Sequence, residues 1–235
     1  MLKQSALART LIALAALFAL IVAVLSISYL YLPAPDMQFV EQRAAFAEAL
    51  WAIRLHAAGG ILALLLGPLQ FVSAIRTRRP GVHRWLGRCY LAAIAIGAIG
   101  AFGLAPSAFG GLVSTLGFSF LAIFWVGSAA TAYRCIRVRD IDAHRRWMMR
   151  TFALTFAAVT LRIELPILMA IGLEHESAYR VVAWLSWLPN LVLMEFWLRR
   201  DIAAVHRGHV TSGFQRQGLM QEGAGDVFRR DFLAK

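Results

Sequence analysis

The chain has 235 residues, of which 60% are hydrophobic and only 16% charged, and its mean hydropathy is +0.64. Soluble globular proteins are close to one quarter charged, so this composition excludes an ordinary soluble domain. The formal net charge of +11 would suit a nucleic-acid-binding protein. That function is excluded by the distribution of the charge, which falls between long apolar blocks.

Six apolar blocks are long enough to cross a bilayer, because a hydrocarbon core of about 30 Å needs about 20 helical residues. In lipid the backbone polar groups must be satisfied within the segment, so each block is predicted to be a helix. The first block is too long for the apolar region of a cleaved signal peptide, and we interpret it as the first span. The predicted spans cover residues 10–32, 50–74, 86–104, 112–134, 147–170 and 179–198.

Lys and Arg are concentrated in alternate connections between the predicted spans. The positive-inside rule keeps basic connections in the cytoplasm, which places both termini there, in a bacterial inner (plasma) membrane. The lipid bilayer is then the expected partner, anionic headgroups are candidate partners for the basic side chains, and nucleic acid is not expected. The exceptions among the 24 basic residues are Arg43, Arg54, Arg162 and Arg180.

Two of the basic connections have closely similar sequences. The segment IRTRRPGVHR at 75–84 reappears as IRVRDIDAHR at 136–145, 61 positions later. Each copy joins two apolar blocks, and each is followed by a tryptophan and an arginine. We therefore expect helices 2–3 and 4–5 to be duplicated hairpins. Independent convergence of two basic loops is the alternative.

These features predict an all-α, polytopic membrane protein with six transmembrane helices, in which helices 2–5 form a four-helix bundle. Small residues such as Gly60 and Gly97 lie on stripes that favour close contact between helices. Residues 1–200 are expected to form a single transmembrane domain. The polar, basic residues 201–235 are expected to form a flexible cytoplasmic tail.

The repeat places His83 and His144 at equivalent positions and at the same depth. Two neutral imidazoles on opposite faces of an iron are the ligand set of a b-type haem. Haem b is therefore the candidate cofactor, with nearby arginines for its propionates and tryptophans beside its ring. A quinone, headgroup or small-anion site and simple interfacial anchoring are alternatives. The flanking residues are Arg84, Trp85, Arg145 and Trp147.

Ionisable residues inside membrane spans are costly, and they mark candidate functional sites. Four of them lie in the outer third of helices 2 and 5, at similar depth for a rise of about 1.5 Å per residue. A buried charge requires a partner, so a polar cluster is expected, with a structural ion pair as the alternative. The candidates are Arg54, His56, Arg162 and Glu164, together with Gln70, which shares a helical stripe with His56.

The stretches LHAAGGILALLLGPLQFVSAIRTRRPGVHRWLGR (55–88) and HRRWMMRTFALTFAAVTLRI (144–163) resemble a family of predicted bacterial membrane proteins, classed as a domain of unknown function. The pattern GPLQF…IR…HRWLGR…HRRWMMR is specific, and it covers helices 2 to 5, about half of the chain. The resemblance implies a multi-helix membrane fold and no established activity. The candidate positions within it are His56, Gln70, His83, Arg84, His144, Arg145, Arg150 and Arg162.

The four-helix core is also similar in outline to cytochrome b561-type electron carriers, which hold one haem towards each side of the membrane. Residues 112–134 contain no histidine, so an outer partner for His56 is missing and at most one inner haem is expected. No hydrolase or nucleotide-binding motif is present. Three functions stay open: a haem- or quinone-linked redox protein using His83 and His144, a small-solute or proton-coupled transporter using the outer cluster, and a non-catalytic scaffold.

Overall fold

The computed structural model describes residues 6–38 and 40–200, which are helical apart from turns and short connections. The predicted tail over 201–235 lies outside the described residues. Two units are distinguished, one ending at Val192 and one beginning at Leu193. The described part of the second unit, 193–200, is helical, and the contacts discussed for the fold belong to the first unit.

Six segments of the described chain are helical, long and apolar enough to cross a membrane, as predicted. The third and fifth begin earlier than expected because the basic His-Arg turns continue the helices beyond the apolar core. Hydropathy alone therefore places these helix starts too close to the bilayer centre. The segments are Thr10–Tyr31, Leu50–Leu69, Pro80–Ser107, Leu112–Arg137, Ile141–Ala170 and His175–Arg200.

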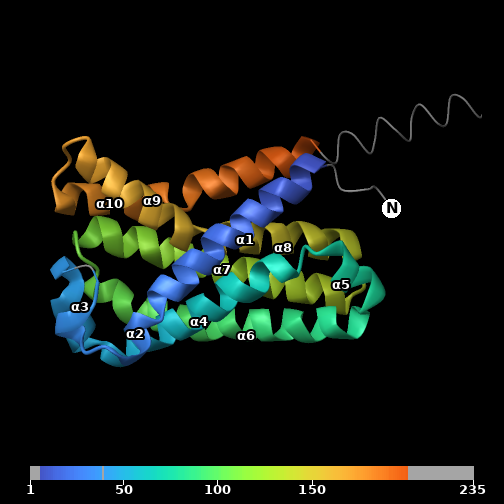
Figure 1. Ribbon diagram of the computed structural model, residues 1–235, viewed down its shortest axis with the longest axis horizontal. Helices are drawn as coiled ribbons and strands as arrows, with labels where there is room; N and C mark the ends of the chain where they lie inside the picture. Colours follow the sequence, from blue (N-terminus) through green and yellow to red (C-terminus); the bar gives the residue numbers. More distant parts are fainter. Residues whose placement is uncertain (1–5, 39, 201–235) are drawn as a thin grey trace, which may run out of the picture. The chain divides into compact units, whose positions relative to one another are not determined.

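Figure 1 labels the helices of the first unit. In chain order the elements are α1 (Ala6–Ser26), α2 (Ser28–Tyr31), η1 (Ala34–Asp36), η2 (Val40–Gln42), α3 (Arg43–Glu48), α4 (Leu50–Leu69), α5 (Ser73–Arg78), α6 (Pro80–Leu104), η3 (Ala105–Ser107), α7 (Leu112–Arg137), α8 (Ile141–Thr155), α9 (Ala157–Ala170) and α10 (His175–Leu185). Short α5 and the first turns of α6 and α8 lie at one end of the bundle (Figure 1). We call this the basic end, after the arginines of the two repeat copies.

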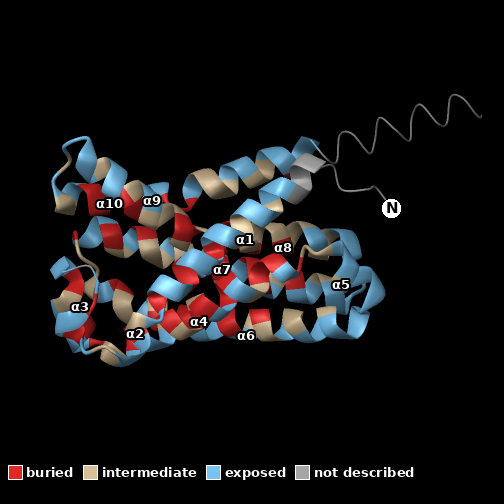
Figure 2. Cartoon of the chain, viewed as in Figure 1, coloured by how far each residue is buried: buried red, intermediate tan, exposed pale blue. Residues whose placement is uncertain are grey.

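The core is a four-helix bundle of α4, α6, α7 and α8. α4 packs along α6, α7 packs along α8, and contacts of α6 with α7 and of α4 with α8 close the bundle. Helices α6 and α8 therefore occupy diagonal corners. The buried stripes of these helices face one another (Figure 2) around Tyr90, Trp125 and Met148. α1 packs on α4 and α9, and α10 packs on α7 and α9, which leaves both outside the predicted four-helix core.

The repeat copies begin their second helix at equivalent positions. α6 begins at Pro80 and α8 at Ile141, which preserves the spacing of the two sequence copies. The backbone N–H groups of His83 and His144 donate to the residue that precedes each helix, over 3.1 and 3.0 Å. The copies differ just before this point, because α7 continues without a break as far as Arg137, within its IRVR segment, whereas α5 is separate from α4.

Glycines bring α4 and α6 into backbone contact. A Cβ atom built on Gly59 would lie 2.3 Å from the Gly97 nitrogen, and one on Gly100 would lie 2.3 Å from the His56 nitrogen. Only hydrogen fits at these positions. Gly60, which the sequence placed on the contact stripe, has open space beside it, whereas Ala63 and Gln70 of the same stripe are buried as expected.

The fifth span, predicted as one helix, has a one-residue break at Phe156 between α8 and α9, where φ of −68° and ψ of −13° stay in the helical region. Asn190 Nδ2 donates to the Ala153 carbonyl over 3.4 Å and to Thr160 Oγ1 over 2.9 Å. These bonds supply donors to oxygens beside the break, which water cannot reach in lipid. One side chain from another span therefore bonds on both sides of the break, and the hydropathy of the span itself gives no sign of it.

Candidate functional site

Three candidate side chains lie at the basic end: Gln70 after α4, His83 on α6 and His144 on α8. We call them the basic-end cluster. His83 lies within electrostatic range of His144 and of Arg76 on α5. Gln70 is only 6% exposed, and its Oε1 lies 3.4 Å from the place of a Cβ on Gly87, one turn beyond His83. The predicted histidines thus come from diagonal helices to one end of the bundle.

Hydrogen bonding fixes the tautomer of one histidine of this cluster. His144 Nδ1 lies 2.8 Å from the Ala132 carbonyl oxygen on α7. A carbonyl only accepts, so Nδ1 carries the proton, and the Nε2 atom of the neutral ring keeps its lone pair. His83 Nδ1 and Gln70 Nε2 are buried and have no hydrogen-bond partner. The cluster therefore holds two unpaired polar atoms and one oriented acceptor.

The residues that flank the two histidines do not all face the cluster. Arg84 and Arg145 are exposed, and Trp85 is 63% exposed. Trp147 packs against the hydrophobic core, with the Arg150 guanidinium 4.6 Å from its ring centroid. Of the two predicted ring-flanking tryptophans, Trp147 is therefore half-buried against the core, and Trp85 lies on the surface.

A second group surrounds Arg162 on α9, far from the basic end in the chain's fold. Arg162 Nη1 donates to the Ala158 carbonyl and Nη2 donates to Ser26 Oγ, each over 3.0 Å. Its Nε is buried without a partner. Both atoms that accept from the guanidinium are neutral oxygens. None of the ion pairs between described residues involves Arg162.

Aromatic hydroxyls and one imidazole complete the surroundings of Arg162. Tyr29, Tyr179 and His56 all lie within range of its charge. The Tyr29 hydroxyl is buried without a partner, and its ring packs edge-on against Phe46 at 5.9 Å. We call Ser26, Tyr29, His56, Arg162 and Tyr179 the arginine site.

The predicted outer cluster of ionisable residues is brought together only in part. His56 Nδ1 lies 3.0 Å from the Gly97 carbonyl oxygen, which the close approach of α4 and α6 makes accessible. Arg54 is exposed. Glu164 is half-buried with Oε2 unpaired, and no ion pair between described residues joins it to Arg54 or Arg162. His56 and Arg162 thus share a site that Arg54 does not enter.

Sequence reasoning missed three members of the arginine site. Ser26 and Tyr29 lie near the end of the first span, and Tyr179 lies on α10. Their only signal is the polar atoms within otherwise apolar segments, which the search for ionisable residues passed over. All three are buried, at 7%, 3% and 7% exposure.

The model of the family described as "Predicted membrane protein (DUF2306)" matches residues 53–198 of the chain. This range is more than half of the chain and extends from within α4 to beyond α10. The chain belongs to the DUF2306 family. The match confirms the predicted membership of an uncharacterised family of membrane proteins. No curated protein and no solved structure matches the chain.

Proposed function

We propose that this DUF2306 protein is a membrane transporter that binds a small organic anion, such as a carboxylate, at the arginine site. The observation that carries the proposal is the Arg162 guanidinium, which is held between spans by two neutral oxygens and has no carboxylate partner among the described residues. An unpaired charge at membrane depth is expensive. A bound anion would supply the missing counter-charge.

The free polar atoms of the site suit a carboxylate. Arg162 Nε and the Tyr29 hydroxyl are both buried and unpaired, and both can donate. Guanidinium and carboxylate groups match in geometry and form strong, charge-assisted hydrogen bonds. The aromatic rings of Tyr29 and Tyr179 offer an apolar wall for the remainder of a small organic acid. Chloride would be attracted by the guanidinium charge, but as a single atom it lacks the two oxygens that could accept from both donors.

The interrupted span supports transport over a purely structural role. Arg162 lies six residues after the break at Phe156, about 9 Å along the helix axis. Transporters often place their binding sites beside discontinuous helices near the membrane centre.

Binding is tested with purified protein in detergent, using acetate and benzoate as probes and chloride as the reference anion. The two carboxylates should raise the unfolding temperature, because a ligand that binds only the folded state stabilises it. Arg162→Met should stay folded, since an apolar replacement of a buried ion is often neutral or stabilising, and should lose this response. Arg54→Met, at an exposed arginine, is the matched control.

Two further measurements separate binding from folding. Tyr29→Phe removes only the unpaired hydroxyl, and we expect it to weaken the benzoate response without lowering the basal unfolding temperature. Uptake of labelled benzoate into proteoliposomes should follow the same order of variants. If Arg162→Met unfolds the protein, or if it responds to carboxylates as strongly as the unaltered chain, the arginine is structural and the proposal fails.

A membrane redox protein is the second candidate, supported by the His144–Ala132 hydrogen bond. Metal-bound histidines usually donate their other ring N–H to a carbonyl or carboxylate, and His144 has this arrangement with Nε2 free. His83 on the diagonal helix would provide a second nitrogen ligand, and bound haem b would supply one-electron transfer. The donor set fits, whereas exposed Trp85 would not border the ring.

The redox candidate is decided by the absorption spectrum of protein produced with added haem precursor. A sharp reduced-state band that His83→Ala and His144→Ala each remove, and that His175→Ala leaves, would support it. A colourless preparation that takes up no haem would exclude it. The arginine site is unaffected by this outcome, because it shares no residue with the basic-end cluster.

A further inference from the structure

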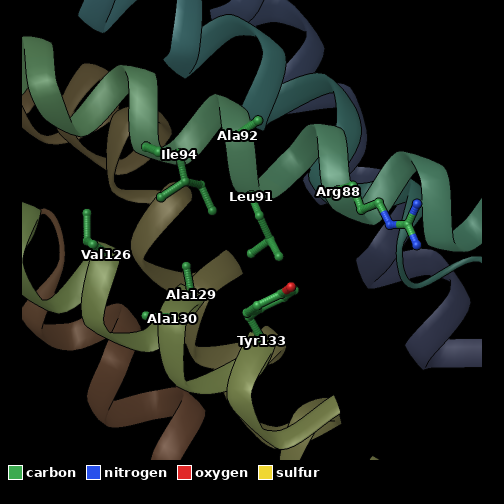
Figure 3. A pocket seen from close by; sticks show the side chains of 9 residues that line it. Arg88, Leu91, Ala92, Ile94, Val126, Ala129, Ala130 and Tyr133 are labelled. Carbon is green, nitrogen blue, oxygen red and sulfur yellow. The ribbon is translucent and has the colours of Figure 1, made fainter. Parts of the chain in front are cut away.

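A groove with a volume of about 430 Å³ lies between α6 and α7 (Figure 3). Four alanines contribute to its lining, and their small side chains leave the space between the helices. The polar side chains of the lining are Arg88 on α6 and Tyr133 on α7. The groove is therefore apolar along its length and polar at one place.

The two helices run antiparallel, so the polar residues fall at the same end. Arg88 and Tyr133 lie at one end in Figure 3, and Ile94 and Val126 lie at the other. Arg88 and Ala95 are seven positions apart on α6, about 10 Å along the helix. The long direction of the groove therefore follows the helix axes, which is also the direction of lipid chains in a bilayer.

Burial shows which side of the groove is open. Ile94 and Ala129 are 1% and 6% exposed and belong to the hydrophobic core, so they form its floor. Ala92 and Ala130 are exposed, so they form its edges. The groove therefore opens to the surface of the bundle, where the bilayer surrounds a membrane protein, and not to its interior.

We propose that this groove binds one acyl chain of an anionic phospholipid, with the headgroup phosphate held by Arg88. The choice of occupant rests on charge complementarity. A second guanidinium stands at the same end, because Arg137 Nη1 donates to the Tyr133 hydroxyl over 3.1 Å. No ion pair between described residues involves Arg88 or Arg137, so both charges are available to a phosphate.

The depth of Arg88 agrees with a headgroup contact. α6 has 25 residues, more than the roughly 20 that cross the hydrocarbon core, so its first turns extend towards the headgroups. Arg88 is the ninth residue of the helix, and its long side chain can reach the polar boundary. Trp85, 63% exposed one turn earlier, is a residue type enriched at this level.

The experiment uses native mass spectrometry of delipidated protein to which dioleoyl phosphatidylglycerol or dioleoyl phosphatidylcholine is returned. We expect one phosphatidylglycerol to be retained preferentially. Arg88→Gln should weaken its retention about five- to tenfold, the value of one arginine near anionic lipid. Ala130→Leu fills the groove, so the acyl chain can no longer enter it and the preferential retention of phosphatidylglycerol should be lost.

Matched controls are available on exposed positions outside the groove. Arg78→Gln removes a charge from the basic end, and Ala170→Leu adds the same side chain to the end of α9; neither should change retention. Equal loss with Arg78→Gln and Arg88→Gln would mean general attraction to the basic end and overturn the site. Equal retention of phosphatidylcholine, or binding of inorganic phosphate as strong as that of the lipid, would overturn it as well.

Discussion

Thr155 is the residue at which polar atoms from three helices meet in the lipid-embedded core. Its hydroxyl donates to the Thr151 carbonyl over 2.9 Å. It accepts from Trp125 Nε1 over 2.8 Å and pairs with the Tyr90 hydroxyl over 2.8 Å. One donor and two acceptors are the full capacity of a hydroxyl. The Thr155 hydroxyl thus provides a hydrogen-bond partner for both the Trp125 indole N–H and the Tyr90 hydroxyl.

We expect Thr155→Val to destabilise the fold by about 1–3 kcal/mol, the cost of leaving a buried polar partner unsatisfied. The change keeps the shape of the side chain, so the loss belongs to the hydrogen bonds of Trp125 and Tyr90. Thermal unfolding in detergent, followed by tryptophan fluorescence, measures it. Thr131→Val is the control, because Thr131 Oγ1 bonds only its own helix at Gly127; equal effects of the two changes would contradict the prediction.

At the scale of elements, the α4–α6 contact depends on which of two adjacent glycines faces the partner helix. Gly59→Ala would place a methyl group 2.3 Å from a backbone nitrogen of α6, so the helices must separate. We expect a loss of about 1–3 kcal/mol, as for other overpacked cores. The separation would also lengthen the His56–Gly97 hydrogen bond and disturb the arginine site.

For Gly60→Ala, one residue away, we expect no loss of stability. Nothing lies within 4 Å of the Cβ that it adds, and alanine favours a helix over glycine by up to about 1 kcal/mol. The protein should therefore unfold at the same or a slightly higher temperature. Equal destabilisation by both changes would show that α4 meets α6 with a different face.

At the scale of the whole molecule, we propose that the basic end faces the cytoplasm of a bacterial inner membrane, with both termini on that side. Positive-inside asymmetry gives the orientation. In a chain without native cysteines (Cys89→Ser, Cys135→Ser), Arg78→Cys should be protected from an impermeant maleimide in intact cells and labelled in inverted vesicles. Ser177→Cys, at the opposite end, should show the reverse; labelling of Arg78→Cys in intact cells would contradict the orientation.

The sequence alone determined the helical class, the six spans, the four-helix core and the family. These follow from the length of apolar blocks and from a motif, and both are local properties of the chain. The repeat also indicated that His83 and His144 would begin equivalent turns of two helices, and they are each the fourth residue of α6 and α8.

Only the tertiary structure decided which polar residues meet. Hydropathy ranks Arg54 and Arg162 alike as intramembrane charges, but helix rotation exposes Arg54 and turns Arg162 towards Ser26, Tyr29 and Tyr179. Beside the break at Phe156, the Ala153 carbonyl likewise accepts a hydrogen bond from Asn190 of another span. The partners of such a side chain lie on other helices, far away in the sequence. Which side chains meet depends on the rotation of each helix about its axis, and helix packing sets that rotation. A local sequence pattern does not encode it.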